Sequence, residues 1–107
     1  MLDKRNFYIN GKWVEPFKPN DFEVINPSNE ETCAVVSLGN EEDVNSAVKA
    51  AKESFPRWSR VEKKYKISLI EKLYKIYESR WEEMTKSISL EMGAPIDWAS
   101  SAQTSSG

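Results

Sequence analysis

Histidine is absent from this sequence of 107 residues, and cysteine and glycine are scarce. The lack of histidine excludes Ser-His and Cys-His catalytic pairs, histidine general bases and imidazole-rich zinc sites. The four glycines stand at positions 11, 39, 93 and 107, too far apart for the glycine-rich loops that bind phosphate groups. The chain therefore lacks the residue patterns of a catalytic dyad and of a glycine-built nucleotide site.

The single cysteine, Cys33, has no partner for an intramolecular disulfide, so the fold does not depend on an oxidising compartment. It lies in the strand-like run TCAVV without a nearby base, which favours a buried structural thiol over a nucleophile. The opening MLDKRN is polar, and no apolar run follows that would serve as a signal peptide or cross a bilayer. We therefore expect a cytoplasmic protein with no membrane partner.

The chain also lacks a large excess of positive or negative charge. The chain has 15 Lys and Arg against 17 Asp and Glu, for a formal net charge of −2. The two signs alternate along the helix-like stretches instead of gathering in a basic patch, so the electrostatic pattern of a nucleic-acid-binding protein is missing. We expect no nucleic-acid partner.

The first 38 residues read as β-hairpins. In FYINGKWV, residues 7–14, the pair Asn10-Gly11 is typical of a type I′ turn, because both residues tolerate a positive φ. A second hairpin is predicted from FEVI, the turn NPSN at 26–29 and the alternating run EETCAVVSL at 30–38. An isolated hairpin is marginal in water, so the first one must pack against something else.

Residues 40–104 change to a helical period. Asn40, followed by three acidic residues, predicts the start of a first helix, and Pro56 predicts its end. One face of that helix carries an apolar stripe: Val44, Ala47, Val48, Ala51 and Phe55. Trp58, just beyond, is predicted to fill the gap at the end of the helix.

A second helix is expected from near Ser59 to about Ser79, and a third from Trp81, unless the two are continuous. Gly93 predicts a left-handed cap at the end of the third helix, and Pro95 just beyond it supports the same helix end. We interpret the aromatic and aliphatic residues at helical spacing as core. The last stretch, 96–107, begins like a helix and ends in small polar residues, as a disordered tail or as an interrupted element whose partners lie further on.

Five stretches in one order resemble the amino-terminal segment of the NAD(P)-dependent aldehyde dehydrogenase superfamily: YINGKWV, FEVINPSNEE, EDVNSAVKAAKESFPRW, a long helix and LEMGAP. The resemblance covers nearly the whole chain. It implies an α/β fold overall, in which residues 1–107 form an incomplete amino-terminal part of the coenzyme-binding domain. It also implies that the first hairpin and the alanine stripe pack on a scaffold supplied mainly by later sequence.

The resemblance further implies the oxidation of an aldehyde to a carboxylic acid, with NAD or NADP as hydride acceptor and a cysteine thiolate as nucleophile, in a complete enzyme that is a homo-oligomer. The family's catalytic and coenzyme-binding motifs do not match any stretch of this chain, and Cys33 does not match the cysteine motif. We therefore expect no catalytic residue and no cofactor-binding residue here, and no activity from these residues alone.

One weaker implication concerns a monovalent cation. Several family members bind such an ion through backbone carbonyls before the Asn-Pro pair and through an acidic side chain before the Gly-x-Pro stretch. By motif these positions are Val24, Ile25 and Glu91, and oxygen ligands suit a hard cation. Here Gly93-Ala94-Pro95 stands where the family often has Gly-Lys-Pro, and Asn29 where it often has glycine.

An alternative from another class is a free-standing, non-catalytic interaction module. Its helices would bind a partner through the face of Ala47, Val48 and Ala51, since an exposed apolar patch marks an interface. Cooperative unfolding of the isolated chain without dye binding would favour this module, whereas a molten or aggregating chain would favour a segment of a dehydrogenase.

Overall fold

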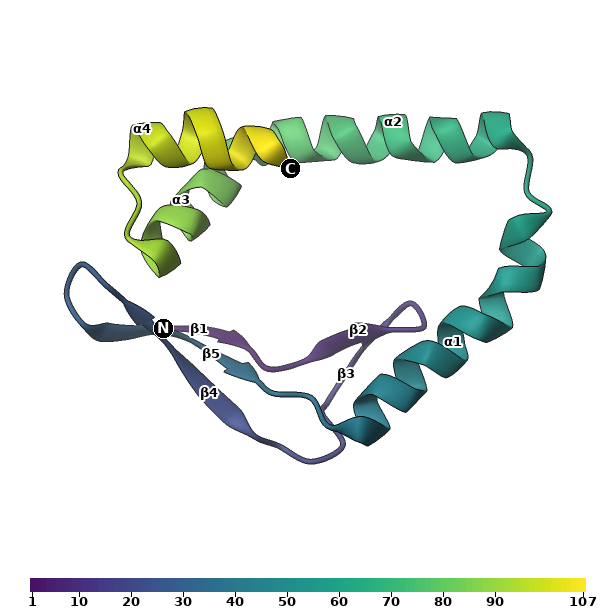
Figure 1. Ribbon diagram of the computed structural model, residues 1–107, viewed down its shortest axis with the longest axis horizontal. Coiled ribbons are helices and arrows are strands. Elements are labelled where there is room, and N and C mark those ends of the chain that lie inside the picture. Colours follow the sequence, from purple (N-terminus) through teal and green to yellow (C-terminus); the bar gives the residue numbers. More distant parts are fainter. The chain divides into compact units, whose positions relative to one another are not determined.

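The computed structural model describes all residues, 1–107, and the chain divides into two compact units. The first unit comprises Met1–Val24 and Thr32–Val61, and the second comprises Ile25–Glu31 and Glu62–Gly107. Five strands precede the helices, which confirms the predicted order of β-hairpins and helices (Figure 1).

The strands are β1 (Leu2–Lys4), β2 (Phe7–Ile9), β3 (Lys12–Val14), β4 (Asp21–Asn26) and β5 (Glu31–Ser37). The helices are α1 (Glu41–Ser59), α2 (Lys63–Ser79), α3 (Trp81–Met92) and α4 (Ile96–Trp98), followed by a π-helical turn, η1 (Ala99–Gln103), and a 3-10 turn, η2 (Thr104–Ser106).

In the first unit, β2 and β3 form the predicted hairpin. Asn10 and Gly11 have φ values of 53° and 76°, as a type I′ turn requires. Tyr8 pairs with Trp13, and their ring centroids lie 5.2 Å apart. Part of the cover for this hairpin comes from α1, because Tyr8, Ile9 and Asn10 line a shallow hollow of about 270 Å³ with small side chains of that helix. Those side chains belong to Ala47, Ala50, Ala51 and Ser54.

The second sheet has the strand order β1-β5-β4 (Figure 1). β4 and β5 are hydrogen-bonded neighbours joined by the predicted turn: the Asn26 carbonyl accepts from the amides of Asn29 and Glu30, at 3.3 and 2.8 Å. The prediction of two hairpins in series was wrong about the first residues, because β1 adds a parallel strand with Leu2 opposite Ala34. Its sequence, LDK, has no apolar alternation and is exposed throughout, so no local pattern indicated a strand.

The start of α1 is confirmed, but its predicted end is wrong. The Asn40 side chain accepts from the Asp43 amide at 3.1 Å, and the Asp43 carboxylate accepts from the Asn40 amide at 3.0 Å, which makes a capping box. Asp43 also accepts from the Phe17 amide at 2.9 Å and ties the preceding loop to the helix. The helix runs through Pro56 to Ser59. Proline removes only one amide donor, and the exposed last turns leave the freed carbonyl open to water.

In the second unit, α2 and α3 are separate helices. α2 begins at Lys63, four residues after the predicted start, and α3 begins at Trp81 as predicted. Arg80, with φ −109° and ψ 15°, interrupts the helical backbone between them. α3 ends at Gly93, whose φ of 69° confirms the left-handed cap.

Residues 96–107 are helical, so the disordered-tail alternative is wrong. Ala99 and Thr104 are fully buried. The Trp81 indole donates to Ser100 Oγ at 3.0 Å, and the Tyr77 hydroxyl donates to the Thr104 carbonyl at 2.8 Å. Small side chains on this stretch let it approach α2 and α3 closely, which explains why a run that looks featureless in sequence is the best-buried part of the unit.

The interpretation of the helical apolar residues as core is wrong within this chain. Ala99 is its one buried hydrophobic residue, whereas Phe55 on α1 and Leu73 on α2 are 65 % and 64 % exposed. Trp58 is also exposed. Most of the apolar stripes on α1 and α2 therefore face outward.

Candidate functional site

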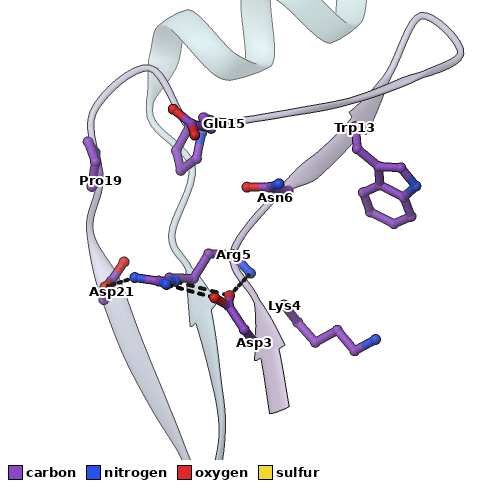
Figure 2. A pocket seen from close by; sticks show the side chains of 9 residues that line it. Asp3, Lys4, Arg5, Asn6, Trp13, Glu15, Pro19 and Asp21 are labelled. Carbon is purple, nitrogen blue, oxygen red and sulfur yellow. Dashed lines mark hydrogen bonds and ion pairs between the residues drawn. The ribbon is translucent and has the colours of Figure 1, made fainter.

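A hollow in the first unit lies beside β1 and has a volume of about 710 Å³ (Figure 2). Its lining residues are Asp3, Lys4, Arg5, Asn6, Trp13, Glu15, Pro16, Pro19 and Asp21. The guanidinium of Arg5 bridges two carboxylates, at 2.7 Å from Asp3 and 3.2 Å from Asp21 (Figure 2). This bridge joins the region of β1 to the start of β4, on either side of β5.

Charge in this hollow is already balanced. Hydrogen bonds from the Arg5 side chain lower the pKa of Asp3 to about 2, and the same carboxylate, with Asp21, raises the pKa of Arg5. Because the arginine already faces two carboxylates, it has little capacity left for an anionic ligand. All three side chains are substantially exposed, so solvent screening keeps the energetic contribution of the pairs small. We interpret the cluster as a surface ion-pair network.

Cys33 lies on β5 and is half-buried, which is less buried than predicted. Its Sγ donates to the Val24 carbonyl on β4 at 3.3 Å. This hydrogen bond links two strands and supports a structural role for the thiol, which the sequence also favoured over a role as nucleophile.

The three residues singled out for a cation lie on two elements. Val24 and Ile25 are consecutive in β4, with Val24 in the first unit and Ile25 in the second, and Glu91 is exposed near the end of α3 in the second unit. The chain contains no group of three or more His, Cys, Asp or Glu side chains that could hold a metal ion. Any cation here would depend mainly on backbone oxygens.

One contact of the second unit was not found from the sequence. The turn residue Pro27 lies against Gly93 so closely that a β-carbon placed on Gly93 would be 2.6 Å from Pro27 Cγ. The side chain of Ser89 donates to the Ala94 carbonyl at 2.7 Å and closes the end of α3 just beside this contact. The turn and the cap were each predicted, but no local pattern joins residues so distant in sequence.

No helix in the structure has the length and apolar character needed to cross a membrane.

Comparison with known proteins gives a consistent result. The model of the aldehyde dehydrogenase family matches residues 13–106. A 3-succinoylsemialdehyde-pyridine dehydrogenase from a Pseudomonas species is 45 % identical over 96 residues, which are 90 % of this chain and 20 % of that protein.

Solved structures agree in three dimensions. An aldehyde dehydrogenase from Bartonella henselae matches 98 % of this chain and 22 % of its own, with a TM-score of 0.96 and 50 % identity. A mutant of aldehyde dehydrogenase C from Pseudomonas syringae, in complex with NAD⁺ and octanal, matches 94 % of this chain and 21 % of its own, with a TM-score of 0.92 and 38 % identity. The chain thus spans about one fifth of the length of these relatives. Because the family model matches most of its residues, the chain belongs to the aldehyde dehydrogenase family.

Proposed function

We propose that residues 1–107 serve as the amino-terminal part of the coenzyme-binding domain of an NAD(P)-dependent aldehyde dehydrogenase. The observation that carries the proposal is the family match over residues 13–106, together with a TM-score of 0.96 to a solved aldehyde dehydrogenase. In the complete protein an aldehyde and water would give a carboxylic acid, while the hydride passes to the nicotinamide and a proton is released. The complexes of relatives with NAD⁺ support NAD as the coenzyme.

The contribution of this segment is structural. It offers two small sheets and a set of helices, and none of its residues matches the family's nucleophile, oxyanion donors or general base. The complete enzyme is proposed to be a cytoplasmic homo-oligomer, which follows from the family resemblance.

The test compares the complete protein with residues 1–107 alone, using octanal and NAD⁺ as the probe and following NADH absorbance. We expect NADH from the complete protein and none from the segment, because the segment has no matching nucleophile or coenzyme site. A reaction without aldehyde is the control for background reduction. NADH from residues 1–107 alone would contradict the proposal, as would no NADH from the complete protein with a panel of aliphatic, aromatic and semialdehyde substrates.

We further propose that Val24, Ile25 and Glu91 contribute oxygen donors to a monovalent cation in the complete protein. The chemistry fits. The Val24 carbonyl accepts from the Cys33 thiol, a weak donor, and Glu91 takes part in none of the ion pairs of the chain.

Thermal unfolding of the complete protein tests the cation proposal, in KCl and in tetramethylammonium chloride at equal ionic strength. We expect a higher midpoint in KCl, because an ion that binds only the folded state stabilises it. Glu91→Gln should remove most of this difference, whereas Glu71→Gln, an exposed control on α2, should preserve it. Equal midpoints of the unchanged protein in the two salts would contradict the proposal.

A further inference from the structure

Residues 96–106 form one helical stretch whose hydrogen bonding changes twice, from α4 to the π-helical turn η1 and then to the 3-10 turn η2 (Figure 1). In η1 the Thr104 amide donates to the Ala99 carbonyl, five residues back instead of the four of an α-helix. Such a turn holds one residue more than a turn of α-helix. Because π-helical turns are rare, this one requires a reason in the structure around it.

The extra residue determines which side chains face the rest of the unit. Ala99 and Thr104 are both fully buried. At about 100° per residue, two residues five apart in a regular α-helix point about 140° away from each other, so one of them would leave the buried face. In a π-turn, where residue i bonds to residue i+5, the same two residues lie one above the other. The π-turn therefore brings both side chains onto one face.

Contacts from α2 and α3 hold the far end of the turn. The Thr104 hydroxyl lies 2.9 Å from the Thr85 hydroxyl, and the Thr104 carbonyl accepts from the Tyr77 hydroxyl at 2.8 Å. At the near end, the Trp81 indole donates to Ser100 Oγ at 3.0 Å, next to Ala99. All of these residues belong to the second unit. The two ends of the turn are thus fixed separately.

Between these ends, Ser101 is exposed, and its hydroxyl donates to the Asp97 carbonyl of the same stretch at 2.7 Å. Without Ser101, Thr104 would follow Ala99 by four residues, so the same amide and carbonyl would close a turn of α-helix. The Ala102 amide would then stand four residues after Asp97 and would replace the lost hydroxyl as donor to its carbonyl. A regular α-helix would therefore keep the buried face once this one residue is removed.

We infer that η1 is a conformational device that accommodates one exposed residue, Ser101, and thereby keeps Ala99 and Thr104 on the same buried face. The π-turn is needed only because that residue is present. The inference goes beyond the proposed function, since it depends neither on the coenzyme nor on a cation.

Deletion of Ser101 in the complete protein tests the inference, with the urea midpoint as the measurement. Deletion of Lys86, an exposed residue in the regular helix α3, is the matched control. It turns Ser89 and Met92 by about 100° relative to Thr85, and no π-turn is there to compensate. We expect a small shift of the midpoint without Ser101 and a shift several times larger without Lys86.

A second measurement shows whether the deletion preserves the buried contact or merely loosens the stretch. Thr104→Val is introduced into the unchanged protein and into the variant that lacks Ser101. If Thr104 still faces Thr85 after the deletion, the substitution lowers the urea midpoint equally in both backgrounds, because the two changes are then independent.

Two results would overturn the inference. One is a loss of stability, or a failure to fold, without Ser101 that matches the effect of deleting Lys86. The other is a Thr104→Val substitution that no longer changes the midpoint once Ser101 is absent, since Thr104 would then have left the buried face.

Discussion

Residues 1–107, purified alone, are expected to bind a hydrophobic dye and to unfold without a sharp thermal transition. The apolar residues of α2 occupy more than half of the helix circumference at about 100° per residue, which is typical of a helix covered on more than one side. Ile70, Leu73 and Tyr74 are each more than 60 % exposed here. The measurement combines dye fluorescence with a circular dichroism melt.

The complete protein is the control for this experiment, and it should bind little dye and unfold cooperatively. A sharp transition of monomeric residues 1–107 without dye binding would contradict the expectation and would favour the free-standing interaction module. The relatives favour dye binding and non-cooperative unfolding of the isolated segment, because the same fold occurs in them within chains about five times as long.

The second large effect is expected from Thr104→Val in the complete protein. Thr104 is fully buried, Thr85 is 5 % exposed, and their hydroxyl oxygens lie 2.9 Å apart. Valine in place of Thr104 leaves the Thr85 hydroxyl buried without this partner, which costs about 1–3 kcal/mol. The expected result is a lower urea midpoint.

The double variant Thr85→Val with Thr104→Val separates this cause from simple loss of packing. Replacing both partners with apolar groups of the same shape is nearly neutral, so the double variant should be more stable than Thr104→Val alone. Thr32→Val is the matched control, because its hydroxyl donates to Glu23 at an exposed site and its loss should change little. A double variant that is less stable than Thr104→Val would refute the explanation.

Local chemistry predicted much of this fold. Asn10-Gly11, the turn at 26–29, the Asn40 cap and the Gly93 cap are features in which a few adjacent residues determine the backbone, and the structure has all four. Pro56 was misjudged because a proline near the end of an exposed helix loses only one hydrogen bond. β1 was missed because its pairing with β5 depends on residues far away in sequence and not on its own pattern.

The candidate site was less predictable than the fold for the same reason. Motif resemblance selected Val24, Ile25 and Glu91, but it could not show that Pro27 touches Gly93. Nor could spacing reveal that Ala99 and Thr104 would be fully buried while two tyrosines of α2, Tyr65 and Tyr74, are exposed. Burial depends on which surfaces meet, and that is a property of the tertiary arrangement.

The bond from Cys33 to the Val24 carbonyl has a practical consequence. A sulfur atom donates only while it keeps its proton, and thiol reagents attack the deprotonated form. Labelling of Cys33 thus requires its bond to the Val24 carbonyl to break, at least briefly. Within these residues the sole sulfhydryl is therefore an intrinsic reporter of this contact, which alkylation kinetics can follow without an added probe.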